Sequence, residues 1–361
     1  MAIVNALKYI ISAAYGNIQA ARAYLYAKGC LSAKKLPCKV VCVGNLTAGG
    51  TGKTPMIMYL AGLLQQHDIP AVILSRGYRG ALEHKGGLVS DRERVLRSAA
   101  EAGDEPYLLA CRLKGVPVYV GRGRYENGLK AVEAFKPAVI LLDDGYQHLQ
   151  LKRDLNLLLM DADKPLDNGY VIPRGMLREK PRALNRAQAV VFTRGHDGQD
   201  SYDLVAPYVE GREPLPHFVS GHRAGCYLVP PQTDLAQAFN SKPDEPAVVF
   251  GNSRPKVFVF SGIAKNQSFL AGARQAGLNV AGARFFPDHY AYTAEDFRRL
   301  QNAAQDAGAE MLVTTEKDHA KLQGRLAVPL AVFGVQINFF GREQAFNDYF
   351  LQALNLPKTI L

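Results

Sequence analysis

The sequence predicts an α/β protein whose strands form parallel sheets. Short apolar runs that resemble strands alternate with patterns typical of helices, and this alternation occurs twice along the 361 residues. Between the two alternations, residues 207–255 are rich in proline, glycine, serine and charged side chains, which is typical of a connection. Strands that are apolar throughout are buried on both faces, so we expect helices on both sides of each sheet.

The first predicted element is a helix over residues 1–28. Apolar residues recur there at steps of three and four, which places them on one stripe of a helix. The longest uncharged run, Tyr9 to Ala21, is shorter than the roughly 20 apolar residues that a membrane-spanning helix needs. Two interpretations stay open: the helix packs on its own domain, or it lies in a membrane interface with its tyrosines at headgroup depth. The stripe consists of Ile3, Leu7, Ile10, Ala14, Ile18, Ala21 and Leu25.

Charge and cysteine content narrow the classes of function. The formal net charge is +10, and no acidic residue precedes Asp68, although several lysines and an arginine do. An acid-free basic segment favours a polyanionic partner, such as nucleic acid, anionic lipid or a phosphorylated substrate. The five cysteines are odd in number and lack the spacing of a zinc site, so we expect a reducing compartment.

The remaining elements follow from the apolar runs. In the first alternation the predicted strands are Lys39–Gly44, Ala71–Ser75, Val116–Val120, Ala138–Leu142, Leu155–Met160 and Ala189–Thr193, with helices at Pro55–Gln66 and Gly128–Phe135. In the second, the predicted strands are Val257–Ser261, Ala281–Phe286, Met311–Thr315 and Pro329–Val335, with helices at Gln267–Ala276, Ala294–Ala307 and Glu343–Leu354. We therefore expect an N-terminal helix (1–28), a first α/β domain (29–215) and a smaller second domain (216–361).

Residues 47–54, "TAGGTGKT", form a glycine-rich loop between a predicted strand and a predicted helix. They nearly match G-x-x-x-x-G-K-[ST], with Thr47 in place of the first glycine. Glycines let several backbone N–H groups face one phosphate chain, and the helix directs its positive end to the same place. In such a loop Lys53 reaches the β and γ phosphates and Thr54 ligates Mg²⁺. The residues predicted to bind nucleotide are Thr47, Ala48, Gly49, Gly50, Thr51, Gly52, Lys53 and Thr54.

A second motif, "PAVILLDDGYQH" (137–148), ends a predicted strand with two adjacent acids, Asp143 and Asp144. Ligands in open α/β sheets bind at the carboxyl ends of the strands. A carboxylate there can hold Mg²⁺ directly or through water, and the sequence does not decide which of the two does so.

The reaction stays open at this point. The guanine-binding pattern N-K-x-D is only loosely matched by "TTEKD" (314–318), and "GRGRYENG" (121–128) is a weak dinucleotide motif. One alternative is a nucleotide-dependent switch that acts on protein partners. Another is a nucleic-acid-binding protein that uses the basic segment, but the sequence has no recognition motif and no interleaved aromatic and basic face. We therefore expect no nucleic-acid partner, and no obligate protein partner is evident.

Eight motifs in one order decide between these alternatives. They are "GNLTAGGTGKTP", "SRGYRG" (75–80), "GDEP" (103–106), "LLDDGYQH" (141–148), "IPRGMLRE" (172–179), "FSGIA" (260–264), "FPDHY" (286–290) and "TTEKD". Together they resemble the tetraacyldisaccharide 4′-kinases of lipid A synthesis over nearly the whole chain. That family also has threonine at the first loop position. The chain departs from it at Arg79, where glycine is frequent.

The resemblance implies transfer of the γ-phosphoryl group of ATP, with Mg²⁺, to the 4′-hydroxyl of a tetraacylated glucosamine disaccharide 1-phosphate. It implies a P-loop NTPase-like three-layer α/β/α domain and a smaller α/β/α domain. It also implies work at the cytoplasmic face of a bacterial inner membrane. The protein would be bound there peripherally or through its N-terminal helix, so the expected partners are the lipid and the membrane surface.

The resemblance also implies roles for individual residues. Asp104 is expected to act as the general base, with His289 orienting it or tuning its pKa, and the two would come from different predicted domains. Lys53 completes the expected catalytic set. The residues expected to bind the substrate are Arg76, Glu105, Gln147, His148, Arg174 and Arg178.

Overall fold

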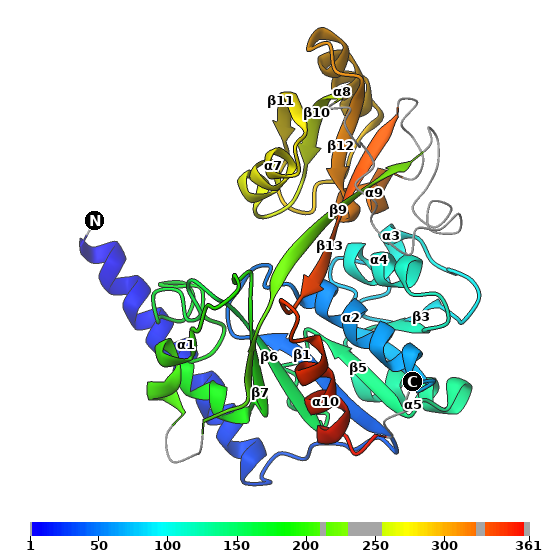
Figure 1. Cartoon of the computed structure of the whole chain (residues 1–361). Coiled ribbons are helices and arrows are strands. Elements are labelled where there is room, and N and C mark those ends of the chain that lie inside the picture. The colour runs from blue at the N-terminus through cyan, green and yellow to red at the C-terminus, as the bar shows by residue number, and fades with distance from the viewer. Residues whose placement is uncertain (1, 210–213, 230–254, 323–328, 357–361) are drawn as a thin grey trace. The chain divides into compact units, whose positions relative to one another are not determined.

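The computed structural model describes residues 2–209, 214–229, 255–322 and 329–356 and shows a mixed α/β protein with parallel strand pairing (Figure 1). This confirms the predicted α/β class with parallel sheets. The chain divides into two compact units: Met1–Arg76, Val116–His222 and Ile337–Leu361 form the first, and Gly77–Gly115 and Arg223–Gln336 form the second. The continuous domain limits expected from the sequence stay a prediction.

The sheet of the first unit is built around β1 (Lys39–Asn45), all of which except Lys39 is buried. β1 pairs in parallel with β5 (Val139–Asp143) on one side and with β6 (Leu155–Asp161) on the other. From β4 to β8 the strand order is β4-β2-β5-β1-β6-β7-β8. The other strands are β2 (Ala71–Ser75), β4 (Val118–Val120), β7 (Ala189–Thr193) and β8 (His217–Val219). The carboxyl ends of β1 and β5 therefore meet at one edge of the sheet.

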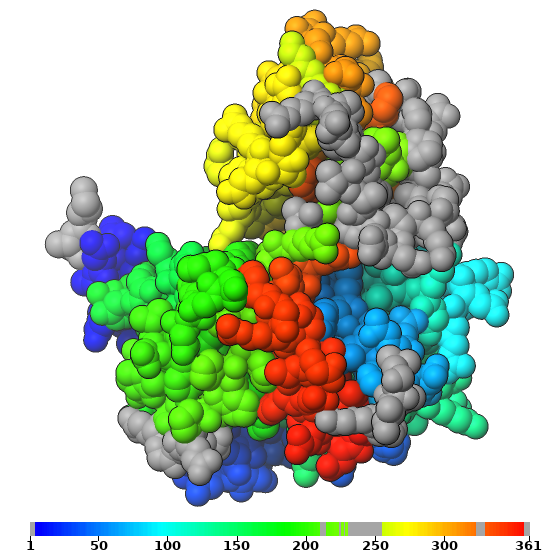
Figure 2. Space-filling view, in the orientation of Figure 1, coloured from blue at the N-terminus to red at the C-terminus, as the bar shows by residue number. Residues whose placement is uncertain are grey.

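Helices from distant parts of the chain cover this sheet. α2 (Lys53–Gln66) packs against β1 and β5, and α5 (Arg124–Phe135) packs against β2 and β4. α10 (Glu343–Ala353) joins from the end of the chain, and its buried Phe346 contacts Tyr59 of α2 and Phe218 of β8. Figure 2 shows α10 in red beside the green segments of the same unit. Short 3₁₀ helices complete the unit at Pro181–Arg186, Tyr202–Leu204 and Ala206–Tyr208.

The N-terminal helix α1 (Ala2–Ala27) lies beside the green segments of the first unit (Figure 1). It packs on them through a small, polar face. The Ser12 hydroxyl is buried and donates a hydrogen bond to the Val171 carbonyl at 2.5 Å, and Gly16 lies close to Val171 and Lys180. The predicted apolar stripe faces outward instead, since Leu7, Ile10 and Ile18 are 56%, 63% and 64% exposed. The interpretation in which the apolar stripe packs on its own domain is therefore wrong for Leu7, Ile10 and Ile18.

A helix that crosses a bilayer has to be both long enough and apolar enough. Within residues 2–209, 214–229, 255–322 and 329–356, no helix meets both conditions.

The second unit contains its own sheet, in the order β11-β10-β12-β13-β9. Val257, Val259, Val313 and Ala331 of its central strands are fully buried and form the centre of the core with residues of α7. The strands of this sheet are β9 (Gly221–Val229), β10 (Lys256–Ser261), β11 (Asn279–Phe285), β12 (Met311–Thr315) and β13 (Leu330–Asn338). The unit also contains β3 (Gly87–Ser90), which is not part of this sheet. Its helices are α3 (Ala99–Ala102), α4 (Asp104–Arg112), α7 (Asn266–Gln275), α8 (Ala294–Asp306) and α9 (Glu316–Leu322).

The elements that the sequence did not predict are short or polar. β8 and β9 lie inside residues 207–255, whose composition is typical of a connection, and the parts at 210–213 and 230–254 lie outside the described residues. α9 is formed by only seven residues, mostly polar, so it lacks the apolar periodicity from which a helix is recognised. α4 begins at a left-handed glycine, Gly103, with φ of 91°.

Candidate active site

The glycine-rich loop joins β1 to α2, and side chains of the first unit hold its carbonyl groups. The Asn45 amide donates to the Thr47 carbonyl at 2.7 Å, and the Thr193 hydroxyl donates to the Thr51 carbonyl at 3.0 Å. The Arg194 guanidinium donates to the Gly50 carbonyl. In a planar trans peptide the next N–H points away from the carbonyl. The amides of Thr51 and Gly52 therefore face the side opposite these partners.

Glycine is required where this loop enters the helix. Gly52 precedes α2 with φ of 79°, a left-handed conformation that costs other residues energy. A Cβ atom on Gly52 would also lie 3.0 Å from Nε2 of His222. The two residues that follow, Lys53 and Thr54, are buried in the first turn of α2. The turn thus places the Lys53 ammonium and the Thr54 hydroxyl beside the backbone N–H groups of Thr51 and Gly52. Together these groups form a set of hydrogen-bond donors suited to a phosphate chain.

Asp144 lies between two cations of the same unit. Its Oδ1 and Oδ2 are both 2.9 Å from Nη1 of Arg178, and Oδ1 is 3.6 Å from Nζ of Lys53. Burial alone would raise the pKa of Asp144, but the Lys53 ammonium and the Arg178 guanidinium outweigh it and hold this pKa below its usual value. Asp144 is therefore an anion that fixes the Lys53 side chain, and it adopts the left-handed φ of 49°.

Its neighbour Asp143 has a different environment. Asp143 is 1% exposed, and its Oδ2 accepts a hydrogen bond from the Ser75 hydroxyl at 2.9 Å. Within the described residues, no group of three or more histidine, cysteine or acidic side chains could hold a metal ion. A magnesium ion on a nucleotide needs only one or two protein oxygens, because phosphates and water supply the rest. The hydroxyl of Thr54 and the oxygens of the acidic pair fit that requirement.

Gln147 and His148 follow the acidic pair in the chain. Gln147 Nε2 donates to the Asn45 carbonyl at 3.0 Å and to Glu179 at 3.1 Å, so this side chain braces the strand that leads into the glycine-rich loop. Burial and the nearby Arg124 and Arg153 lower the pKa of His148 to about 4. His148 is consequently neutral at neutral pH and supplies no positive charge.

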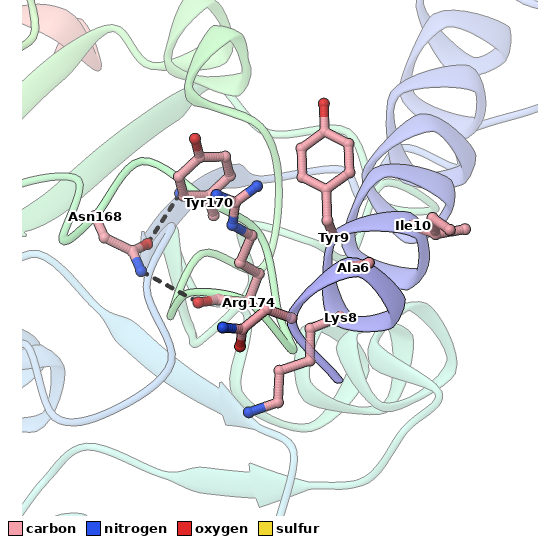
Figure 3. Close-up of a pocket in the computed structure, with 8 residues that line it drawn as sticks. Ala6, Lys8, Tyr9, Ile10, Asn168, Tyr170 and Arg174 are labelled. Atoms are coloured by element: carbon pink, nitrogen blue, oxygen red, sulfur yellow. Dashed lines mark hydrogen bonds between the residues drawn. The ribbon is translucent and has the colours of Figure 1, made fainter. Parts of the chain in front are cut away.

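Arg174 lies apart from Arg178, although both belong to one predicted motif. Its guanidinium lies 3.7 Å from the ring centre of Tyr170 and 4.8 Å from that of Tyr9 on α1 (Figure 3). These residues line a cavity of about 680 Å³ between α1 and the loop around residue 170. The cavity is lined by Asn5, Ala6, Lys8, Tyr9, Ile10, Asn168, Tyr170 and Arg174. It combines cationic and aromatic side chains, a composition suited to an anionic ligand with an apolar part.

The turn that carries Arg174 depends on Gly175. A Cβ atom there would lie 2.0 Å from Oδ1 of Asn168 and 2.3 Å from the Tyr170 carbonyl, so only glycine fits. Arg76, another predicted arginine, is exposed directly after β2.

The second unit holds the other predicted pair. Asp104 is the first residue of α4, and its Oδ2 is 3.1 Å from Nδ1 of His289. His289 has a left-handed φ of 60°, which only the surrounding structure can enforce. The two side chains are 17% and 24% exposed, so both are shielded yet reachable. The sequence places them in different expected domains, whereas the structure brings them together inside one compact unit.

Two lysines of α9 lie close to the first residues of α4. Lys317 pairs with Glu105, and Lys321 Nζ lies 3.8 Å from Oδ2 of Asp104. Sequence reasoning missed both lysines, because "TTEKD" predicts no contact with a segment some 200 residues away. It also missed Asn45, Ser75, Thr193 and Arg194. The first three are polar residues that end apolar strands, which is a local signal, whereas Arg194 gives none.

Comparison with known proteins identifies the family. The family model described as Tetraacyldisaccharide-1-P 4′-kinase matches residues 4–355. The chain belongs to the tetraacyldisaccharide-1-P 4′-kinase family. Two relatives named tetraacyldisaccharide 4′-kinase are similar to it. The protein of Desulfatibacillum aliphaticivorans is 38% identical over 99% of this chain and 94% of its own length. That of Geobacter metallireducens is 43% identical over 89% of each.

A solved structure of this kinase family shares the fold. The crystal structure of LpxK from Aquifex aeolicus, described as an "apo" form in complex with ATP, is 32% identical with a TM-score of 0.73. The match covers 97% of this chain and 99% of that chain. The resemblance stated from sequence motifs is thus confirmed at the level of the family.

Proposed function

We propose that this chain is an ATP-dependent kinase of lipid A biosynthesis. It transfers the γ-phosphoryl group of ATP to the 4′-hydroxyl of a tetraacylated glucosamine disaccharide 1-phosphate. Membership of the kinase family supports this reaction. The observation that carries it is the geometry of the glycine-rich loop. Thr193 and Arg194 hold the loop carbonyls on one side, so the backbone N–H groups of Thr51 and Gly52 face the other side, beside the buried Lys53.

The first unit handles ATP. The loop amides and Lys53 hold the phosphates, and Arg178 keeps Asp144 charged and in place. Thr54 with Asp143 or Asp144 would hold Mg²⁺, which neutralises charge on the phosphates when bound. The strand order around β1, with the loop after it, supports a P-loop NTPase-like α/β/α fold for this unit. A smaller α/β/α fold is proposed for the second.

The second unit supplies the proton acceptor. Asp104 takes the proton of the 4′-hydroxyl, and His289 orients its carboxylate through the 3.1 Å contact. The remaining predicted arginines and polar residues bind the lipid. Arg174 stands in a cavity of about 680 Å³ that fits an anionic sugar, and Arg76, Glu105, Gln147 and His148 are proposed to assist.

We further propose that α1 binds the surface of the membrane that holds the lipid, at the cytoplasmic face of the inner membrane. The exposed Leu7, Ile10 and Ile18 form an apolar face, and Lys8 adds positive charge for acidic headgroups. A substrate with four acyl chains stays in the bilayer, so the enzyme has to reach it there.

Membrane binding is tested by changing Ile10 and Ile18 together to aspartate. The variant should move from the membrane pellet to the soluble fraction, because two charges cannot enter the acyl region. Leu129→Asp is the matched control, since Leu129 is an exposed apolar residue of α5 in the same unit. Unchanged sedimentation of the double variant would count against the proposal.

The reaction is tested with γ-labelled ATP and purified tetraacyldisaccharide 1-phosphate in detergent micelles. Label should enter the lipid fraction at the 4′ position, and Lys53→Ala should prevent it. ATP hydrolysis that protein partners stimulate, without label in the lipid, would favour the nucleotide-dependent switch instead.

A further inference from the structure

Asp104 makes its ionic contacts through one oxygen. Nδ1 of His289 lies 3.1 Å from Oδ2, and Nζ of Lys321 lies 3.8 Å from the same Oδ2. None of the ion pairs that Asp104 forms with described residues falls on Oδ1. The two oxygens of this carboxylate therefore have different surroundings, because the His289 ring and the Lys321 ammonium both lie at Oδ2.

Lys321 is held firmly in this position. Its side chain is 9% exposed, and its Nζ lies 3.0 Å from Oδ1 of Asp318, whose side chain is 0% exposed. The ammonium also lies 5.6 Å from the ring centre of Tyr292. A lysine so enclosed has lost most of its rotamer freedom, so it presents its charge to Asp104 in a fixed direction.

The same buried Asp318 also anchors the histidine. Its Oδ2 accepts a hydrogen bond from the Gly262 amide at 3.1 Å, and the Gly262 carbonyl accepts one from the His289 amide at 3.2 Å. The Tyr292 hydroxyl donates to Oδ1 of Asp318 at 2.9 Å, and Thr315 donates to Oδ2 at 2.8 Å. One carboxylate thus fixes both groups that contact Asp104.

Resting on the proposed function, we propose that Lys321 is a positioning residue for phosphoryl transfer and that Asp318 anchors it. Together with His289, Lys321 occupies Oδ2 of Asp104 and leaves Oδ1 to face the acceptor. In the transfer step the 4′-oxygen forms a bond to the γ-phosphorus, the bond to the ADP oxygen breaks, and the hydroxyl proton passes to Oδ1 of Asp104.

The test compares Lys321→Met with Lys321→Arg in the full-length enzyme, using steady-state kinetics with ATP and the tetraacyldisaccharide. Lys321→Met should lower kcat roughly 10- to 100-fold, because the carboxylate loses its orientation. The KM values for ATP and lipid should stay within about twofold, since Lys321 acts through Asp104. Lys321→Arg keeps the charge and should restore most of kcat.

Arg112→Met is the matched control. Arg112 pairs with Glu316 at 2.8 Å across the same α4–α9 contact but does not reach Asp104. Its kcat should equal that of the wild type. Because Asp318 is buried, Lys321→Met is checked by urea unfolding, and Lys321→Gln, which keeps a donor without the charge, is measured beside it.

Three outcomes overturn the inference. They are an unchanged kcat in both Lys321→Met and Lys321→Gln, a kcat of Lys321→Arg as low as that of Lys321→Met, or a raised KM for the lipid at unchanged kcat. Failure of the proposed function looks different: the wild type would not label the lipid, or Asp104→Asn would keep full activity.

Discussion

Two carboxylates, one in each unit, show how similar charges are arranged for different tasks. Asp144 of the first unit has both oxygens 2.9 Å from Arg178 and one oxygen 3.6 Å from Lys53. Asp104 of the second unit has its contacts with His289 and Lys321 on Oδ2 alone. A carboxylate engaged on both oxygens holds charge in place, whereas one with an oxygen to spare can accept a proton.

The two sites also differ in how the chain builds them. The glycine-rich loop and the acidic pair are short contiguous segments on neighbouring strands, β1 and β5. The Asp104 site combines residues that lie 185 positions apart with a third segment, α9. Contiguous motifs fix local backbone shape, whereas dispersed residues depend on packing of the whole unit.

The largest expected effect tests the first unit. Lys53→Ala should lower kcat/KM by about 10³- to 10⁴-fold, because the proposed role of the Lys53 ammonium is to stabilise the charge of the transition state on the phosphates. Affinity for ATP should fall as well, which isothermal titration calorimetry measures. Lys39→Ala serves as control, since Lys39 forms a half-exposed pair with Asp154 away from the loop. Equal ATP affinity in wild type and Lys53→Ala would contradict the assignment.

The next effect tests the second unit. Asp104→Asn should lower kcat by about 10²- to 10³-fold, since an amide cannot accept the hydroxyl proton. ATP affinity should stay unchanged, in contrast to Lys53→Ala, and this contrast separates the tasks of the two units. Binding titrations and single-turnover rates check it. Loss of ATP affinity in Asp104→Asn would remove the distinction.

The shape of the glycine-rich loop was predictable from sequence because it is set by a short contiguous segment. "TAGGTGKT" specifies the turn, and Gly52 indeed has the left-handed φ of 79°. The position of Arg174 was not predictable. It belongs to the same motif as Arg178, but the chain turns at Gly175 and sends Arg174 to α1. Arg79, where the family often has glycine, also adopts a left-handed φ of 63°.

The site around Asp104 could not be predicted in full from local sequence patterns. The resemblance supplied Asp104 and His289, but Lys321 has no motif of its own and only the packing of α4 on α9 brings it near. The orientation of α1 was likewise undetermined. Periodicity predicted an apolar stripe, yet the helix packs through the opposite face, where Ser12 and Gly16 allow it to lie close to Val171.

A smaller effect concerns the charge held by Asp144. Arg178→Met should lower the free energy of unfolding by about 1–3 kcal/mol at pH 7, because the partly buried Asp144 carboxylate loses a guanidinium whose Nη1 donates to both of its oxygens. The folded pKa of Asp144 lies below 3.8, so its contribution is present above that pH and is lost as pH falls through the folded value. The difference between wild type and variant should therefore narrow below pH 4.

Urea unfolding at several pH values measures this difference. Arg174→Met is the control, since the Arg174 guanidinium lies 3.7 Å from the ring centre of Tyr170 and pairs with no carboxylate among the described residues. A gap between wild type and Arg178→Met that stays constant down to pH 3 would mean that Asp144 does not owe its low pKa to Arg178.

The smallest effect concerns His148, whose folded pKa is about 4 against 6.5 for the free side chain. As pH falls below 6.5 the unfolded chain takes up a proton that the folded protein refuses, so stability is lost until pH 4. His148→Gln lacks this titration. Between pH 7 and 4 the wild type should therefore lose about 1–2 kcal/mol more than the variant, after allowance for the partial exposure of His148. Parallel losses in urea unfolding would show that His148 is protonated in the folded protein despite Arg124 and Arg153.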